Sequence, residues 1–431
     1  MMMIRSKKDF QFYRMKNVIV IGSGALGLCT AYFLRKKGVK VSVISASKKN
    51  DEMGCSFGNA GMIVPSHFTP LAAPGVIKDA LKWLLDSKGP LYIKPRMNAD
   101  LVAWMWKFLK SANAKNVERS SELLLNLNSK SRDLFHDISV KENIDFEYHK
   151  QGLMMLYKSA KYQDEEEQLA LKAKEMGIDV EILDQKAIQD HEKDLGVNAL
   201  GGVWYKSDAH IIPHQFMIQL REILELNGIN FIDEVSIDRI NHRNNLIQSI
   251  ESNGLSYEAD EFVLCTGAWS QSLVKQLGIN IPIQGGKGYH LHSQNVPHQL
   301  KTPSILCEAR IAMTPMQNDL RISGTMEIAG LDLSINKNRV EGIKENAVKY
   351  FDKLSPDYFE GLKPWAGLRP VSPDGLPYVG RSSKYQNFLF NTGHAMMGLS
   401  LAPVCGSIIS ELIFEEQSEF PLTVFSPDRF G

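Results

Sequence analysis

The sequence has no excess of charge of either sign, because 49 Lys and Arg residues balance 49 Asp and Glu residues among 431. Proteins that bind nucleic acid usually carry a basic excess, so the composition argues against that class of partner. The five cysteines are scattered and have no Cys-x-x-Cys spacing. They therefore indicate neither a disulfide framework nor a metal site, and they fit a reducing compartment.

Long apolar runs are also missing. Residues 1–15 are charged and lack the apolar stretch of a secretory signal, so they are expected to form a leader. The most apolar window, 395–414, is interrupted by Gly398, Pro403 and Gly406, which makes it a poor candidate for a membrane span. These absences predict a cytoplasmic protein and leave open peripheral contact with the inner face of a membrane.

The strongest local pattern is a glycine-rich turn inside segment 17–45, which reads as strand, turn, helix and strand. Gly22 allows a tight turn, Gly24 lets a pyrophosphate approach the backbone, and Gly27 lets the helix pack closely against the strand. Free N–H groups at the start of the helix would bind the phosphates. The segment therefore predicts a dinucleotide-binding domain.

The end of the second strand departs from the usual pattern. An acidic side chain commonly accepts hydrogen bonds from the ribose there, whereas this chain has Ser45, which brings no charge. Lys48 and Lys49 follow, so a nucleotide with a 2′-phosphate remains an alternative, although such lysines are more often a solvated turn.

The rest of the chain alternates helical and strand patterns. Segment 75–114 is helical in pattern and carries Trp83, Trp104 and Trp106, which are typical of an interior helix face and also suit contact with a bilayer surface. Further helices are predicted at 117–143, 162–176, 214–227, 339–354 and 400–414. Strands are predicted at 146–156, 230–235, 246–250, 281–291, 310–324 and 388–391, and at the start of 261–270.

Six motifs then occur in a fixed order along residues 17 to about 414. They are Gly22-Ser-Gly-Ala-Leu-Gly27, Ser56-Phe-Gly-Asn-Ala-Gly61, Cys265-Thr-Gly-Ala-Trp269, Gly286-Lys-Gly-Tyr289, Gly367-Leu-Arg-Pro-Val-Ser-Pro-Asp-Gly375 and Asn391-Thr-Gly-His394. Together they resemble the flavin-dependent D-amino-acid oxidase superfamily, and most closely its D-amino-acid dehydrogenase branch.

The resemblance implies FAD as the cofactor and an α/β fold. A discontinuous Rossmann-type FAD-binding domain would be joined to a second, α+β substrate domain of antiparallel sheet and helices. The implied boundaries place the FAD-binding domain at 16–75, 199–280 and 361–431, and the substrate domain at 76–198 and 281–360.

The resemblance also implies the residues around the cofactor. The 56–62 loop would lie beside the isoalloxazine, Val235 would touch adenine through its backbone, and Gly393 to Met397 would open a helix directed at the ring. A helix N-terminus there would stabilise negative charge on the reduced flavin. The expected cofactor-binding residues are Gly22, Ser23, Gly24, Ala25, Leu26, Gly27, Ser45, Ser56, Asn59, Ala60, Gly61, Met62, Val235, Thr266, Gly267, Gly393, His394, Met396, Met397 and Gly398.

Arg369 is the residue implied to bind the substrate. Its planar, two-pronged guanidinium matches a carboxylate, and a structural ion pair is the alternative. Tyr289 could close over the substrate and Lys287 could lie near the flavin, although both side chains could equally be packing residues. His394 and His210 are further candidates for the pocket, and a purely structural role for His394 is as well supported.

The implied reaction is hydride transfer from the substrate Cα to flavin N5, followed by hydrolysis of the imine to a keto acid and ammonia. The expected substrate is a small amino acid, either a D-amino acid or a cyclic one such as a hydroxyproline. Electrons would pass to a quinone, an electron-transfer protein or O2. The alternatives are an oxidase of glycine, sarcosine or an opine, and a flavin-binding partner subunit without activity of its own.

Overall fold

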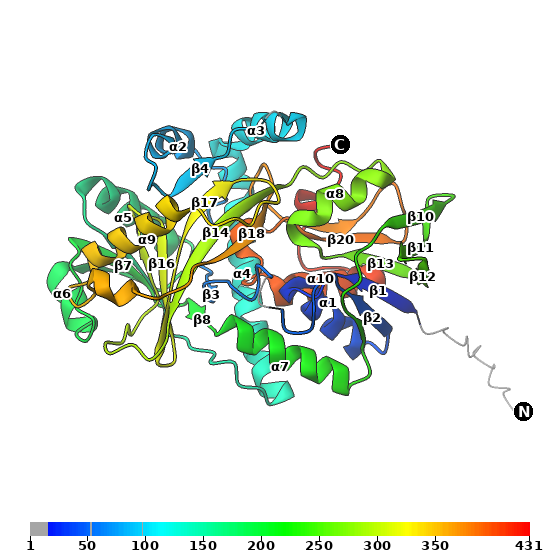
Figure 1. The fold of residues 1–431 in the computed structure, drawn as a ribbon, viewed down its shortest axis with the longest axis horizontal. Coiled ribbons are helices and arrows are strands. Elements are labelled where there is room, and N and C mark those ends of the chain that lie inside the picture. The colour runs from blue at the N-terminus through cyan, green and yellow to red at the C-terminus, as the bar shows by residue number, and fades with distance from the viewer. Residues whose placement is uncertain (1–15, 52–53, 97) are drawn as a thin grey trace, which may run out of the picture.

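The computed structural model describes residues 16–51, 54–96 and 98–431, so the leader expected at 1–15 lies outside the described residues. Two large sheets lie side by side (Figure 1). The sheet on the right of the figure contains the first strand of the chain, and the larger sheet on the left is built mainly from the middle of the chain. This arrangement confirms the α/β class with a Rossmann-type sheet.

The right-hand sheet has six strands. Their order is β19 (Tyr378–Arg381), β20 (Phe388–Thr392), β13 (Glu261–Leu264), β1 (Asn17–Ile21), β2 (Lys40–Ile44) and β9 (Asn230–Ile232). All neighbours are parallel except β19 and β20. The β-branched runs of β1 and β2 supply buried side chains such as Val18, Val20 and Val43, as expected for central parallel strands. The carboxyl ends of β1, β2 and β13 therefore meet at one edge, where ligands of such sheets bind.

Helices pack against this sheet and against one another. α1 (Ala25–Lys36) packs against α7 (Pro213–Leu226) and α10 (Ala402–Ile413), and α10 also contacts the long α4 (Ala114–Glu142). A small sheet of β10 (Arg239–Arg243), β11 (Leu246–Ser252) and β12 (Leu255–Glu258) lies beside the six-stranded sheet, and the short α8 (Ser270–Val274) follows β13.

The left-hand sheet has nine strands. Eight follow the order β18 (Trp365–Val371), β14 (Gln284–Ser293), β17 (Asp319–Ile328), β16 (Ile311–Met316), β15 (Ser304–Leu306), β5 (Leu153–Tyr157), β7 (Gly201–Tyr205) and β6 (Val180–Asp184), and β4 (Leu91–Ile93) also pairs with β17. The sheet is mixed rather than purely antiparallel, because β15 with β5 and β17 with β4 run parallel. Its remaining helices are α2 (Val76–Leu84), α3 (Ala99–Ser111), α5 (Ala160–Glu175), α6 (Gln185–His191) and α9 (Lys337–Tyr350).

Three predicted elements differ from the structure. The helical pattern of 75–114 forms α2, β4 and α3 instead of one helix, because Pro90 and Pro95 interrupt it. The single strand predicted at 310–324 is a hairpin of β16 and β17 that turns at Gln317, whose φ is 58°. The strand predicted at 146–156 begins only after Gly152, which has a φ of 80°.

The sheets also differ from the predicted domain boundaries. β7 and β18 were expected in the FAD-binding segments 199–280 and 361–431. In the structure both strands lie in the nine-stranded sheet. The short strands β3 (Met62–Ile63) and β8 (Ala209–His210) form a separate antiparallel ribbon. No helix among the described residues is both long enough and apolar enough to cross a membrane.

Candidate flavin and substrate site

The glycine turn has the geometry that its spacing predicts. Gly22 has a φ of 110° and its N–H donates to the Ile44 carbonyl over 2.8 Å. A Cβ at Gly22 would lie 2.6 Å from the carbonyl oxygen of Cys265, and one at Gly27 would overlap the Gly22 carbonyl. Gly24 is the N-cap of α1 and has no side-chain cap bond, so the first turn keeps donors for a phosphate beyond the Ala25 N–H, which donates to Ser56.

A pocket of about 370 Å³ opens at the carboxyl ends of β1 and β2. Gly22, Val235 and Thr266, three of the expected cofactor-binding residues, line it. Further lining residues that were not anticipated are Ile21, Ile44, Ala46, Ser236, Ile237, Asp238, Trp269, Ser272, Leu273 and Gln276. The position and the size of the pocket fit the nucleotide part of FAD.

Ser45 is engaged inside the protein. Its hydroxyl accepts hydrogen bonds from the Ser23 hydroxyl over 2.8 Å and from the Ser47 N–H over 3.2 Å. The nearby Lys49 pairs with Glu225 at 2.6 Å, and Lys48 lies 4.0 Å from Glu234. Each lysine thus has an acidic side chain nearby, which weakens the alternative of a 2′-phosphorylated nucleotide.

The loop at 54–62 lies against the start of α1. The Ser56 hydroxyl accepts a hydrogen bond from the Ala25 N–H over 3.1 Å, and a Cβ at Gly24 would lie 3.3 Å from the same oxygen. Asn59 accepts from the Gly61 N–H over 2.8 Å, and Gly61 has a φ of 84°. Two motifs separated in sequence therefore meet, and the half-buried Ala60 and Met62 belong to the same loop.

Three side chains from the nine-stranded sheet fix this loop, and sequence reasoning missed all three. Arg321 on β17 is 5% exposed and donates to the carbonyls of Asn59 (2.7 Å) and Phe57 (3.3 Å). His290 on β14 lies 3.0 Å from the Gly58 carbonyl, and burial lowers its pKa to about 3, so the neutral ring donates through Nδ1. Trp365 stacks on His290 with ring centroids 4.7 Å apart and covers Gly58.

Hydroxyl groups join two further motifs behind the pocket. Thr266 Oγ1 lies 2.9 Å from Ser270 Oγ, which lies 2.8 Å from Thr392 Oγ1. Thr392 also donates to the carbonyl of Gly267 over 3.2 Å. The Cys265 to Trp269 motif and the Asn391 to His394 motif are thus held together at one end of the six-stranded sheet.

The segment after Gly393 corrects one expectation. Gly393 and Ala395 have positive φ values of 76° and 47°, which interrupt helical geometry. A 3₁₀ turn, η4 (Ala395–Met397), therefore comes first, and α10 begins only at Ala402, with Pro403 in its first turn. Met396 is 45% exposed, and contact of Met396, Met397 and Gly398 with the ring stays a prediction.

His394 lies inside the protein. It is 1% exposed, its Nε2 is 3.3 Å from the Sγ of Cys405 on α10, and burial lowers its pKa to about 3. The ring is therefore neutral and packs against the helix. This placement favours the structural interpretation of His394, and a contact with the flavin stays a prediction.

Arg369 lies on β18, where the strand borders both sheets. Its side chain crosses the backbone of Gly288, because a Cβ at Gly288 would lie 2.5 Å from the guanidinium Cζ. Nη1 donates to the Thr325 carbonyl over 2.7 Å. The positive charge also lowers the pKa of Cys55, which burial raises more strongly, so Arg369 faces the 54–62 loop.

No acidic side chain of the described residues lies within 4.0 Å of the Arg369 guanidinium nitrogens. The structural ion pair considered as the alternative therefore finds no partner in the part of the chain that the structure describes. Thr325 has a φ of 69°, and the register between β14 and β17 shifts at this point. The bulge turns the Thr325 carbonyl toward Arg369.

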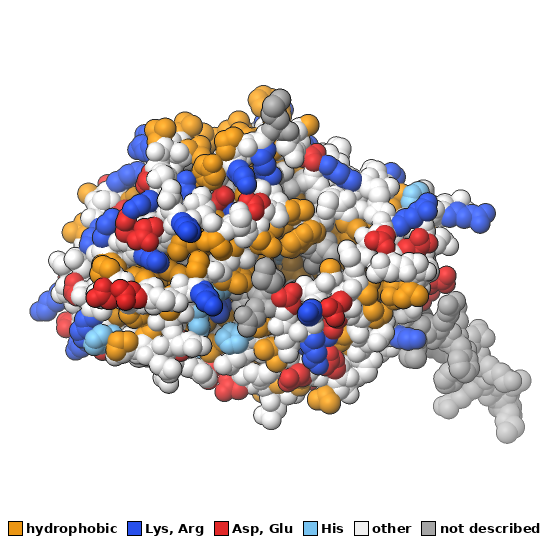
Figure 2. Space-filling model, viewed as in Figure 1, with side chains coloured by type: hydrophobic (Ala, Val, Ile, Leu, Met, Phe, Trp, Pro, Cys, Tyr) orange, Lys and Arg blue, Asp and Glu red, His pale blue; other side chains and the backbone are white. Residues whose placement is uncertain are grey.

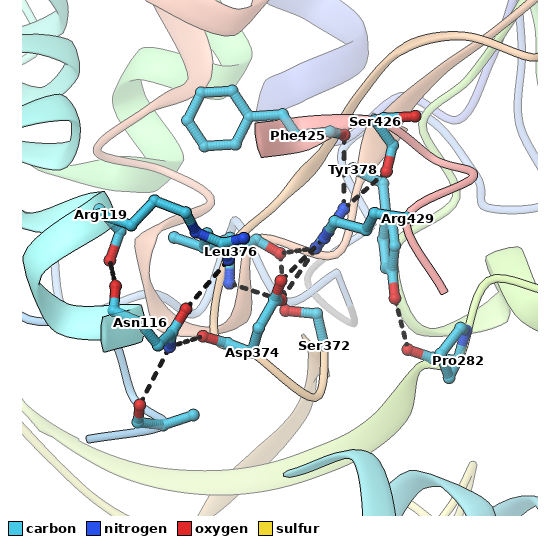
Figure 3. Close-up of polar contacts among 12 residues, drawn as sticks. Asn116, Arg119, Pro282, Ser372, Asp374, Leu376, Tyr378, Phe425, Ser426 and Arg429 are labelled. Atoms are coloured by element: carbon cyan, nitrogen blue, oxygen red, sulfur yellow. Dashed lines mark hydrogen bonds and ion pairs between the residues drawn. The ribbon is translucent and has the colours of Figure 1, made fainter. Parts of the chain in front are cut away.

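The turn that follows β18 is fixed by a polar network (Figure 3). Arg429 binds both carboxylate oxygens of Asp374, over 2.8 and 2.9 Å, and its guanidinium lies 4.0 Å from the ring centroid of Tyr378. Asn116 on α4 donates to the Asp374 carbonyl over 3.1 Å. The C-terminal segment thus holds the end of the strand that carries Arg369.

Tyr289 and Lys287 lie on the face of the sheet opposite Arg369. In the β14–β18 pairing, Gly286 and Gly288 lie opposite Arg369 and Gly367, so Lys287 and Tyr289 point to the other face of the sheet. The Tyr289 hydroxyl donates to Glu327 over 2.7 Å, and the fully buried Lys287 Nζ lies 3.3 Å from Glu327. Both side chains lie on the face opposite Arg369, which favours the packing alternative, and a contact with substrate or flavin stays a prediction.

His210 lies beside the loop. It pairs with Met62 in the β3–β8 ribbon, and its ring centroid is 5.2 Å from that of His149. Burial lowers the pKa of His210 to about 3, so the ring is neutral. Its Nδ1 is buried and has no hydrogen-bond partner among the described residues. A role in the pocket stays a prediction.

Comparisons with known proteins match nearly the whole chain. The family model described as FAD dependent oxidoreductase (DAO) matches residues 17–412. A D-amino acid dehydrogenase of Helicobacter pylori is 32% identical over 399 residues, which cover 92% of this chain and 94% of the relative. A D-amino acid dehydrogenase of Vibrio atlanticus is 31% identical over 420 residues, covering 96% and 99%.

Solved structures share the fold. Glycine oxidase from Geobacillus kaustophilus superposes with a TM-score of 0.76 at 19% identity, covering 97% of this chain and 100% of that one. L-proline dehydrogenase from P. horikoshii gives 0.74 at 16% identity, covering 96% and 98%. With the glycine turn, the pocket and the 54–62 loop in place, the chain belongs to the FAD dependent oxidoreductase (DAO) family, and its cofactor is FAD.

Proposed function

We propose that this chain is a dehydrogenase that oxidatively deaminates small D-amino acids with FAD. The observation that carries the proposal is Arg369, a guanidinium that lies on a glycine backbone, faces the 54–62 loop and has a carbonyl as its partner. The names of relatives about one-third identical over most of both chains support the D-amino-acid substrate.

Arg369 suits the binding of an amino-acid carboxylate. Burial lowers the pKa of Arg369, yet a guanidinium stays charged, and its Nη1 donates to the Thr325 carbonyl. A carboxylate would add a charge-assisted, two-pronged contact to this guanidinium. The carboxyl group is therefore the part of the substrate that this site is built to recognise.

The protein residues would act mainly by orientation. When bound, FAD supplies the acceptor for a hydride from the substrate Cα. Arg369 would fix the carboxylate, so that rotation of the substrate is restricted and the Cα–H bond keeps one direction. His290, Arg321 and Trp365 would hold the loop carbonyls in place. His210 and His394 are neutral above about pH 4, so neither brings a positive charge to the pocket at physiological pH.

The decisive experiment is anaerobic reduction of the purified holoenzyme. Small D-amino acids should bleach the flavin absorbance, whereas their L-enantiomers should act much more slowly. Bleaching by glycine or sarcosine with no response to D-amino acids would favour the oxidase alternative. A spectrum that stays oxidised with every amino acid in the panel would refute the proposal and favour a partner subunit without activity.

The substrate role of Arg369 has its own test. Arg369→Ala should lower kcat/KM roughly 100-fold, mainly through KM, because a charge-assisted contact is worth about 1.5–3 kcal/mol. Arg369→Lys should recover only part of the loss, since it cannot form the two-pronged contact. Arg243→Ala, at an exposed arginine of β10, is the matched control. An unchanged KM in Arg369→Ala would remove the assignment.

The electron acceptor can be tested with the same protein. We propose that the acceptor is a quinone or an electron-transfer protein rather than O2. After anaerobic reduction by substrate, addition of a short-chain ubiquinone should reoxidise the flavin much faster than air-saturated buffer does. Faster reoxidation by oxygen would identify an oxidase instead.

A further inference from the structure

We propose that the outer face of α2 and α3 docks the protein on the surface of an anionic phospholipid bilayer. The docking face consists of Leu81, Leu85, Val102, Met105, Trp106 and Leu109. These six residues lie within 29 positions, yet they make up one-third of the 18 large apolar side chains that are exposed among the described residues. Such clustering marks an interaction surface rather than scattered exposure.

The exposure is high where a surface helix is normally polar. Leu85 is 91% exposed, Val102 65%, Leu81 63% and Trp106 60%. No residue of α2 is buried, although four of its nine positions are Leu, Ile or Val and a fifth is Trp. Four of these apolar side chains are half-buried and Leu81 is exposed, so the helix lies at the surface with none of them fully enclosed.

Helix α3 has two apolar stripes. Leu101 and Trp104 face inward, and the Trp104 Nε1 donates to the Val371 carbonyl over 2.9 Å. Val102, Trp106 and Leu109 face outward at a spacing of four and three residues, which places them on one side of the helix. Packing within the chain explains the inner stripe, and it leaves the outer stripe without a function.

The charge around the docking face identifies its occupant. Residues 76–111 contain seven Lys and Arg residues and three Asp residues, whereas the whole chain is neutral. Lys78, Lys82 and Lys110 are exposed and form no ion pair with any acidic side chain that the structure describes. Two residues of each sign are paired with residues outside the segment, Lys88 with Glu345, Lys94 with Asp332, Asp79 with Lys161 and Asp100 with Lys275, so the basic excess remains.

The combination of exposed Trp and Leu with lysines at the border is typical of a helix that lies in the plane of a membrane interface. Lys110 lies 4.8 Å from the ring centroid of Trp106, so its charge stays at the border while the ring points outward. Figure 2 shows apolar side chains gathered along the upper edge of the molecule, where Figure 1 places α2 and α3. A second copy of the same basic face would be repelled, whereas anionic lipid headgroups would be attracted.

The inference does not depend on the proposed substrate, and it can be tested without turnover. Purified holoenzyme should co-sediment with vesicles of phosphatidylglycerol and phosphatidylcholine, and binding should weaken in high salt. Vesicles of phosphatidylcholine alone should bind at least tenfold less. The absence of binding to both kinds of vesicle would overturn the proposal.

Two variants locate the contact. Trp106→Ser with Leu109→Ser should reduce binding to anionic vesicles at least tenfold, and Lys82→Glu with Lys110→Glu should do the same. Leu226→Ser, at an 86% exposed leucine at the end of α7, is the control and should bind like the wild type. Flavin content and melting temperature should stay unchanged, because the altered side chains are exposed.

Other occupants give different results. If the docking face joins two copies of this chain, light scattering without vesicles will show a dimer that Trp106→Ser with Leu109→Ser converts to a monomer. That outcome would overturn the proposal, and so would vesicle binding that is equally strong in the wild type and in both double variants.

Discussion

The backbone of Gly288 leads to the sharpest prediction. A Cβ at this position would lie 2.5 Å from Cζ of Arg369 and would also overlap both terminal nitrogens. Gly288 has no positive φ, so the backbone itself accepts an alanine. The obstacle is the end of a flexible side chain, which can move at little cost. Gly288→Ala should therefore displace the guanidinium and leave the fold intact.

The expected effect follows from that displacement. Loss of the carboxylate contact corresponds to about 2–3 kcal/mol, so kcat/KM for an amino acid should fall roughly 30- to 150-fold. The melting temperature should change by only a few degrees, since a compatible Gly→Ala change alters stability by about 1 kcal/mol or less. Steady-state kinetics, flavin absorbance per protein and thermal melts measure the three quantities.

A double-mutant cycle tests whether Gly288 acts through Arg369. In an Arg369→Ala background the added methyl group meets no guanidinium, so Gly288→Ala should then cost almost nothing further. Additive losses in the double variant would show that Gly288 acts on the loop or the cofactor directly. That result would refute the argument.

Two further predictions concern buried charges. Arg429→Ala removes both contacts to Asp374, which is 3% exposed. Because an uncompensated buried charge costs about 3–5 kcal/mol, the variant should lose stability in thermal melts. Asp374→Asn combined with Arg429→Ala should recover part of the lost stability. Burial raises the pKa of Asp208 to about 7, against about 3.9 in the unfolded chain, so its ionisation opposes folding increasingly as the pH rises from about 4 to 7. Asp208→Asn should therefore melt at a higher temperature than the wild type at pH 8. Its free energy of unfolding should be greater by up to about 4 kcal/mol there, and this difference should shrink toward pH 4. A gap between the two melting curves that is constant with pH would contradict the Asp208 prediction.

Short-range patterns explain what the sequence predicts well. The turn at Gly22 is determined by residues within a few positions, and the apolar runs of β1 and β2 are continuous, so the nucleotide-binding unit can be recognised without a structure. The contact of Ser56 with Ala25 was not anticipated, because no local pattern places the 54–62 loop against α1.

Strand direction and long-range contacts explain which side-chain placements could not be predicted from the sequence. Tyr289 lies next to Gly288, yet successive residues of a strand point to opposite faces, and only the register with β18 decides which face Arg369 occupies. Arg321, His290 and Trp365 come from three different strands and meet at the carbonyls of one loop. Their spacing in the sequence carries no signal of that meeting.

β18 connects these observations. It pairs with β14 in the nine-stranded sheet and also contacts η1 (Gly267–Trp269) and η4 on the cofactor side. Trp104 from α3 binds the carbonyl of Val371 at its end, and the Asp374–Arg429 pair holds the turn that follows. Because hydride transfer depends on the direction of one bond, a small displacement of this strand would misalign the substrate. Substitutions at Trp104 or Arg429 that the fold survives should therefore lower kcat, although neither side chain lies beside Arg369.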